Sequence, residues 1–471
     1  MRRVWAGRFG PVGQVNQVMS RLASLTQGNS LAARVMRSGS WMVIGYGGNQ
    51  ALRLAANLIL TRLLFPDAFG LMTLVNVVLV GLQMFSDFGL VPSIAQNPRG
   101  DDPDFLDTAW TLQTIRGGVL WLLTCLLAYP AAQFYNEPDL ALYLPIAGLT
   151  ILISGFNTTK IETANRHLMV GRLTVLDLTS QVLGMVAMVW MAWVMQSVLA
   201  LVLGGIVQTS LRWGLTWYLL PGHRNRFRLE RAAAHNLLHF GKWLFFSTVF
   251  WFFTSQGDRV ILGKFISLEM LGLYNIGYFL ASFPTLMAQN INGRLLIPVY
   301  RDKPPRDSRK NFRNLRKLRS GITLVLLALS MAFAFGGPAL VDLLYDPRYD
   351  LSGPIVTLVA CMLTPAMIAV TYDQAPLAAG DSRSYFFFSM ARAMAMIGSI
   401  LFGAIHFGLI GAIVGMGAGT VLTYPVVVWI SVKHGVWDPL HDLVFAVLTA
   451  IPVAGAIWLH WDKIIALAAA S

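Results

Sequence analysis

Six arginine residues lie inside long apolar stretches of this sequence, where charged side chains are rare. They are Arg53, Arg116, Arg212, Arg259, Arg294 and Arg392. An arginine near the centre of a bilayer costs at least ~2.5 kcal/mol on insertion scales, so it faces a partner or a water-filled cavity rather than lipid. A guanidinium group stays charged and binds phosphate oxygens in pairs. These arginines are therefore candidates for an anion-binding site within the membrane.

The six arginines differ in their expected depth. Arg53, Arg116 and Arg392 lie well inside their apolar stretches, and for them we favour a cavity over a structural ion pair. The other three lie toward the ends of their stretches, where the side chain can instead extend to the membrane surface.

Helical spacing places further polar residues on shared helix faces. In the first apolar stretch, one face carries Asn49, Gln50, Arg53 and Asn57. A second face, at steps of three and four residues, carries Asn275, Tyr278, Ser282, Thr285, Gln289 and Asn292. We predict that both faces line a polar interior, with Asn49, Asn57, Gln289 and Asn292 as site residues. Hydrogen bonding between packed helices is the alternative.

Acidic residues are fewer in these stretches. Asp87 and Asp373 are candidates for binding a coupling cation, although an ion pair with an arginine is the favoured interpretation for each. Asp258 adjoins Arg259, and each charge would keep the other ionised in a low dielectric.

The sequence contains no recognisable catalytic or cofactor motif. Its two cysteines, Cys125 and Cys361, fall in apolar stretches and form no CxxC pair. A nucleophile elbow, an HExxH motif and a P-loop are all absent from the sequence. We therefore expect a protein that is not an enzyme and that binds neither a metal nor a cofactor.

The composition is that of a multi-pass membrane protein. Of 471 residues, 55% are hydrophobic and 13% are charged, with a mean hydropathy of +0.58, whereas soluble domains carry roughly 25% charged residues. A membrane helix needs about 20 mainly apolar residues. Thirteen stretches fit that length, at 39–61, 69–94, 105–129, 140–159, 173–195, 198–220, 241–262, 270–299, 321–344, 352–378, 384–405, 409–431 and 443–461.

A duplicated segment divides these stretches into two halves. Residues 60–74, LTRLLFPDAFGLMTL, recur 202 residues later at 262–276, LGKFISLEMLGLYNI, so Gly70 corresponds to Gly272. Each copy joins one apolar stretch to the next, as in an internal repeat. We predict an all-α fold of two six-helix lobes plus one extra C-terminal helix. The expected divisions are a basic arm 1–37, an N-lobe 38–220, a linker 221–240, a C-lobe 241–432 and an extension 433–471.

Basic residues predict the orientation. With a cytoplasmic N-terminus, 26 Lys and Arg residues fall on the cytoplasmic side and four on the opposite side, as the positive-inside rule requires. The net charge of +13 is then mainly topological. We expect the basic segment 301–319 to meet anionic lipid headgroups rather than nucleic acid.

Several segments resemble a known transporter family. They are LTRLLFPDAFGL, FSDFGL, GDRVILG, LGLYNIGY and NGRLLIPVY, in that order along the chain. Together they are similar to the polysaccharide transporter family of oligosaccharide flippases, within the multidrug/oligosaccharidyl-lipid/polysaccharide exporter superfamily. The resemblance covers roughly residues 38–435, and Arg259 of GDRV matches an arginine that recurs in the family.

The resemblance implies a V-shaped pair of lobes in a bacterial inner membrane. Such a protein moves an undecaprenyl-pyrophosphate-linked oligosaccharide from the cytoplasmic to the periplasmic leaflet by alternating access, for exopolysaccharide, capsule or O-antigen synthesis. A polysaccharide polymerase and chain-length or export proteins are the implied partners. The thirteenth stretch and the basic arm depart from the simplest twelve-helix pattern.

Three alternatives stay open at this point. A cation-coupled drug or metabolite antiporter of the same superfamily would depend on buried acids rather than arginines. A flippase for lipid-linked peptidoglycan precursors typically has fourteen spans. A membrane-embedded polysaccharide polymerase or ligase would usually carry a large periplasmic loop, which this sequence lacks. The sugar, the energy source and the oligomeric state do not follow from the sequence.

Overall fold

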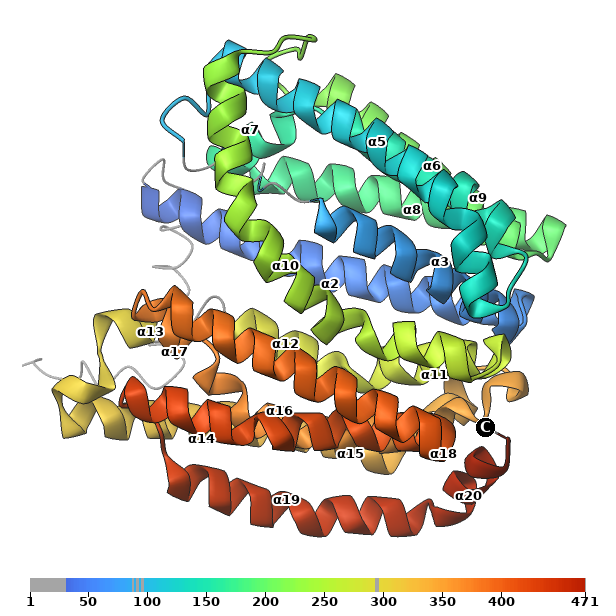
Figure 1. The fold of residues 1–471 in the computed structure, drawn as a ribbon, viewed down its shortest axis with the longest axis vertical. Coiled ribbons are helices and arrows are strands. Elements are labelled where there is room, and N and C mark those ends of the chain that lie inside the picture. The colour runs from blue at the N-terminus through green and yellow to red at the C-terminus, as the bar shows by residue number, and fades with distance from the viewer. Residues whose placement is uncertain (1–30, 87–88, 90–92, 95–96, 293–295, 471) are drawn as a thin grey trace, which may run out of the picture.

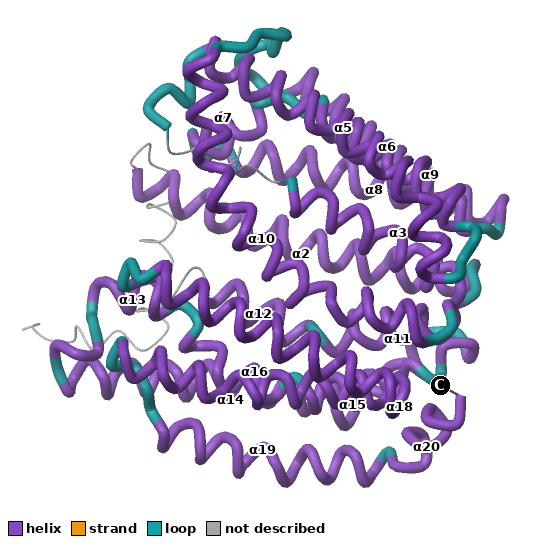
Figure 2. Tube along the Cα trace, viewed as in Figure 1, coloured by secondary structure: helices purple, strands orange, loops and turns teal. Residues whose placement is uncertain are grey.

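A computed structural model describes residues 31–86, 89, 93–94, 97–292 and 296–470. Within these ranges every regular element is a helix and none is a strand. The long helices run side by side in two groups, which converge at one end and diverge toward the other (Figures 1 and 2).

The first group is formed by the N-terminal part of the chain. It contains α2 (Leu31–Leu63), α3 (Pro66–Phe85), α5 (Pro103–Tyr135), α6 (Leu140–Gly155), α7 (Lys160–Arg166), α8 (Val170–Met195) and α9 (Val198–Leu219). A long helix then crosses from this group to the second one. It is α10 (Arg231–Phe265).

The second group is formed by the C-terminal part. It begins with α11 (Leu268–Ala281), α12 (Phe283–Ile291), α13 (Ile297–Asp302), the turn η2 (Pro305–Asp307) and α14 (Arg309–Leu344). It continues with η3 (Pro347–Tyr349), α15 (Ser352–Met362), α16 (Thr364–Ala369), η4 (Val370–Tyr372) and α17 (Ala375–Ala378). It ends with α18 (Ser382–Lys433), α19 (Pro439–Leu459) and α20 (Trp461–Ala470).

Not every expected stretch forms an uninterrupted apolar helix. In the described ranges eight helical segments are long and apolar enough to cross a membrane, and the bent pair α6–α7 would make a ninth. The remaining expected stretches do not form separate apolar helices, for three reasons. Helices α2 and α10 carry polar and charged residues, and a break at Ser282 separates α11 from α12. Helix α18 contains two of the expected stretches.

The chain reverses direction inside α18. Phe407 and Gly408 are not helical, and Gly408 has φ 59°, a conformation that favours glycine. The two arms then pack closely, since a methyl group on Gly403 would lie 2.0 Å from the Gly411 carbonyl oxygen. Small residues thus allow the two arms of this hairpin to pack closely.

The two copies of the duplicated segment meet at the end where the groups converge, here called the repeat end. α3 packs against α11, and a methyl group on Gly70 would lie 1.9 Å from the Leu268 carbonyl oxygen. In the equivalent contact, a methyl group on Gly272 would lie 2.0 Å from the Pro66 carbonyl oxygen. The repeated glycines thus let two helix starts touch through their backbones.

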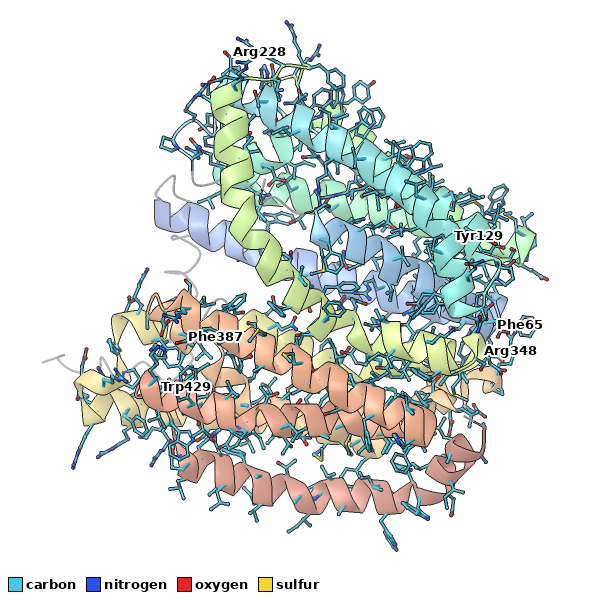
Figure 3. The ribbon with its side chains drawn as sticks, in the orientation of Figure 1. Phe65, Tyr129, Arg228, Arg348, Phe387 and Trp429 are labelled. Atoms are coloured by element: carbon cyan, nitrogen blue, oxygen red, sulfur yellow. The ribbon has the colours of Figure 1, made fainter. Side chains whose placement is uncertain are left out.

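A loop of the second group strengthens this contact. The Tyr349 hydroxyl donates to the Leu64 carbonyl oxygen at 2.9 Å, and the Tyr349 ring lies edge-on to Phe69 at 6.1 Å. The Arg348 guanidinium lies 4.7 Å from the Phe65 ring centre, as Figure 3 shows at the same place. Hydrogen bonds, ring contacts and helix packing therefore all join the groups at the repeat end.

The opposite end, here called the basic end, carries most loop arginines and lysines. There Arg99 binds both carboxylate oxygens of Glu230 at 2.8 Å. These hydrogen bonds lower the pKa of Glu230. Helix α10 begins at the next residue and packs Ala233 and Leu237 against Phe105 of α5. The final part of the expected linker is thus already helix, attached to the first group.

The extra C-terminal helix is bonded into the second group. Asp442 of α19 accepts hydrogen bonds from Tyr372 at 2.8 Å and Tyr424 at 2.6 Å. The neighbouring His441 is buried and lies 3.1 Å from the Thr323 hydroxyl. Since buried polar groups need such partners, α19 is held by more than contact with its apolar face.

The glycine contact at the repeat end can be tested by adding one methyl group. We expect Gly70→Ala to lower the thermal unfolding temperature of the purified protein, because the methyl group would collide with backbone that cannot rotate away. Gly118→Ala in α5 is the matched control, since nothing lies within 4 Å of its added methyl group and alanine favours helix. Equal unfolding temperatures for the two variants would contradict a tight glycine contact.

Candidate functional site

Arg53 projects from α2 toward the second group of helices. Its guanidinium lies 5.2 Å from the ring centre of Phe279 on α11. Its Nη1 lies 3.4 Å from the Gln50 side-chain oxygen, at the limit of a hydrogen bond. Arg53 is exposed and has no acidic partner among the residues that the structure describes. Its charge is thus available at the boundary between the groups.

Arg259 of α10 approaches the same part of α11. Its guanidinium lies 4.7 Å from the Tyr278 ring centre and donates to the Gln256 side-chain oxygen at 3.2 Å. Asp258 is 3.8 Å away, but that carboxylate also accepts a hydrogen bond of 2.6 Å from the Tyr274 hydroxyl. The acid therefore divides its interactions between an arginine and a tyrosine.

Together these residues form a positively charged site between the groups. Arg53 and Arg259 contact the adjacent rings Phe279 and Tyr278, and each lies within electrostatic reach of the other. Asp258 pairs with Arg259 alone, so Arg53 adds a charge that no described carboxylate neutralises. Like charges placed together in a low dielectric repel each other, so an anion with several oxygens would be stabilised between them.

Arg116 has a different environment. From α5 it donates to the Ser86 hydroxyl at 2.9 Å and to the Gln83 carbonyl oxygen at 2.6 Å, both at the end of α3. It therefore joins two helices of the first group. Asp87, the candidate for ion coupling, and Arg294 lie outside the described residues.

Arg392 forms the ion pair that the sequence left as the alternative to a cavity role. Its two terminal nitrogens bind the two oxygens of Asp373 at 2.8 and 2.7 Å. Its guanidinium also lies 4.3 Å from the Phe388 ring centre. Since both side chains are mostly buried, this pairing neutralises two charges within the second group. Asp373 is therefore already occupied by a cation of the protein itself.

Arg212 also has an acidic partner. Its Nε lies 2.7 Å from an Asp177 carboxylate oxygen, and both side chains are about 40% exposed. The pair connects α9 to α8 within the first group. This ion pair balances the charge of Arg212, so its side chain need not extend to the membrane surface.

The polar faces of the helices are only partly open. The side chains of Asn49, Asn57 and Gln289 have no hydrogen-bond partner among the described residues, and Asn49 and Gln289 are exposed. In contrast, Asn292 is buried and donates to the Val370 carbonyl oxygen at 2.8 Å. Asn292 thus contributes to packing within the second group, as the alternative interpretation held.

One buried arginine escaped the sequence analysis. Arg319 is 1% exposed, donates to the Tyr300 hydroxyl at 3.1 Å and lies 4.1 Å from the Tyr372 ring centre. In the sequence, charged neighbours make it part of the basic segment 301–319. The spacing of the apolar residues Leu315 and Ile322 does indicate its burial, because it places Arg319 on the inward face of α14.

Comparison with known proteins now decides the family. A family described as "Polysaccharide biosynthesis protein" matches residues 59–354. This chain belongs to that family. It is 24% identical over 392 residues to the succinoglycan biosynthesis transport protein ExoT of Rhizobium meliloti (strain 1021), covering 81% of this chain and 77% of the relative. It is 21% identical over 387 residues to the lipopolysaccharide biosynthesis protein WzxC of Escherichia coli (strain K12), covering 82% and 78%.

Solved structures confirm the predicted fold. The chain is similar to an inward-facing multidrug resistance MATE family transporter of the MOP superfamily, with a TM-score of 0.62, 15% identity and coverage of 82% of this chain and 94% of that one. It is also similar to the lipid II flippase MurJ in an inward closed conformation, with a TM-score of 0.62, 12% identity and coverage of 90% and 99%. The two-lobed helical architecture expected from the resemblance is therefore correct.

The ion pair between Arg392 and Asp373 can be tested by restoring charge balance. We expect Arg392→Gln to destabilise the protein by about 3 kcal/mol, since it leaves a largely buried carboxylate without a partner. Adding Asp373→Asn should recover much of the loss, as measured by thermal unfolding in detergent. Failure of the double variant to recover would contradict a stabilising role for the ion pair.

Proposed function

We propose that this protein is a flippase for a lipid-linked oligosaccharide, acting in polysaccharide biosynthesis. The observation that carries the proposal is the Arg53–Arg259 site, where α2 and α10 bring two arginines to adjacent rings of α11 and Asp258 pairs with Arg259 alone. Family membership and relatives whose names include transport and polysaccharide biosynthesis support it. The cargo we infer is an undecaprenyl-pyrophosphate-linked oligosaccharide moving from the cytoplasmic to the periplasmic leaflet.

The chemistry of this cargo requires fixed cations. A pyrophosphate carries several negative charges, and moving them unaided through hydrocarbon would be very costly. Arginine remains charged and binds phosphate oxygens bidentately. Exposed polar side chains such as Asn49 and Gln289 offer hydrogen-bonding groups for sugars, while the polyprenyl chain stays in lipid.

The arrangement of the lobes supports alternating access. Backbone contacts at Gly70 and Gly272 join the lobes at the repeat end, whereas the helix groups diverge toward the basic end (Figure 1). We infer that the basic end is cytoplasmic and that cargo enters there. Rocking of the lobes about the site would then separate the repeat-end contacts. A membrane potential that is negative inside favours outward movement of the anion, by ~2.3 kcal/mol per charge per 100 mV.

The remaining roles are proposals of the same kind. Arg116 would support the first lobe near the cargo path. Arg294 and Asp87 stay candidates for cargo and cation binding, whereas Asp373 would act in cation coupling only if Arg392 released it. Polymerase and chain-length proteins would act on the cargo after its transfer.

The cargo site can be tested at Arg53. We expect Arg53→Ala to weaken binding of polyprenyl-pyrophosphate-linked oligosaccharide by about tenfold to a hundredfold, the usual value of hydrogen bonds to a charged group. Arg53→Lys should retain part of the binding because the charge remains. Binding to purified protein and polymer export in cells would both be measured.

The matched control is Arg62→Ala, on the same helix but at the repeat end. Its side chain is exposed, so binding and export should be unchanged. Equal loss of folded protein in the Arg53 and Arg392 variants would contradict a cargo role for Arg53. Normal export by Arg53→Ala at normal protein level would contradict it as well.

The orientation can be tested with an exposed cysteine at each end, after replacement of Cys125 and Cys361. Ser308→Cys at the basic end should resist an impermeant thiol reagent applied from the periplasm. Asp139→Cys at the repeat end should react readily. The reverse pattern would show that the basic end is periplasmic, and the direction of transfer would have to be inverted.

A further inference from the structure

An open groove lies in the N-lobe, apart from the arginine site between the lobes. Its volume is about 460 Å³, and its lining comes from α2, α8, α9 and no other element. The lining residues are Trp41, Gly171, Arg172, Val175, Leu176 and Leu219. Five of these six residues are apolar or lack a side chain, and the sixth is a cation. The groove therefore has the two-part character of a site for an amphiphile.

The apolar part of the groove depends on a glycine. A methyl group on Gly171 would lie 2.9 Å from the Trp41 ring nitrogen, so the ring can lie close to the start of α8 only because that side chain is absent.

 The exposed fraction is 50% for Val175 and 61% for Leu219, so both side chains present apolar surface that a hydrocarbon chain can cover.

The polar part of the groove is positively charged. Arg172 is exposed and makes no hydrogen bond or ion pair with any described residue. The nearest acid along α8 is Asp177, which is already bound to Arg212 at 2.7 Å. Helix α8 also begins without a side-chain cap at Met169, so the free N–H groups of its first turn add to the positive potential.

The groove lies at one surface of the membrane. It is formed where α2 and α8 begin and α9 ends, which places it at the basic end. Tryptophan is enriched at membrane–water interfaces, and Trp41 forms part of the wall. A molecule that occupies the groove must therefore place a polar group at the interface and an apolar chain in the hydrocarbon.

We propose that this groove binds an anionic glycerophospholipid from the leaflet at the basic end. The phosphate lies at Arg172 and the first turn of α8. One acyl chain lies along Val175 and Leu219, against the Trp41 ring. This site requires only that the protein spans a membrane, so it does not depend on the identity of the transported cargo.

The proposed lipid site can be tested by native mass spectrometry of the full-length protein in detergent. Phosphatidylglycerol or phosphatidylcholine is added, and the lipid that stays bound is measured. We expect preferential retention of phosphatidylglycerol. Arg172→Gln should reduce that retention about fivefold, the effect of one basic residue near an anionic surface. Arg383→Gln is the matched control, since it removes an exposed arginine at the start of α18 in the other lobe and should change retention little.

A second variant tests the apolar part. Val175→Trp fills the groove and should reduce retention of both lipids while leaving the thermal unfolding temperature unchanged in detergent without added lipid. Equal retention of the two lipids, or equal effects of the Arg172 and Arg383 variants, would overturn the proposal. Displacement of phosphatidylglycerol by an equimolar polyprenyl phosphate would also overturn it, because the groove would then belong to a polyprenyl ligand.

Discussion

The cost of placing a charge in hydrocarbon governs this structure. Every arginine within the membrane needs a carboxylate, a set of neutral acceptors or water around it. Arg392 and Arg212 have carboxylate partners, and Arg116 binds neutral acceptors at the end of α3. Arg53 and Arg259, by contrast, lie at the boundary of the lobes, where Asp258 pairs with Arg259 and no described carboxylate pairs with Arg53. The distribution of partners thus separates structural arginines from those available to an anion.

Duplication gives the protein a second organising feature. Because the two lobes derive from one pattern, equivalent helix starts face each other across the lobe boundary, and the same small residue is needed at both positions. Gly70 and Gly272 meet this need by exposing backbone rather than side chains. Around these glycines, Tyr349 bonds to the Leu64 carbonyl oxygen and packs on Phe69, so opening this end must also break side-chain contacts.

Local sequence patterns predicted much of this fold. The duplicated segment, the two lobes and the extra helix follow from apolar length and internal similarity. The partners of individual charges did not follow, because Arg392 and Asp373 meet only after the chain folds. Arg319 was missed for a related reason, since a basic neighbourhood hid the inward face of α14. The arginine site was therefore predictable by residue type, but its pairing was not.

Helix α10 belongs to both lobes. Over its 35 residues it packs against α3 and α5 in one lobe and against α18 in the other, without a break. Any rotation of one lobe relative to the other must therefore bend this helix or exchange its contacts along one side. The elasticity of a single helix would then set how far the lobes can turn, and Arg259, carried near its end, would shift with every cycle.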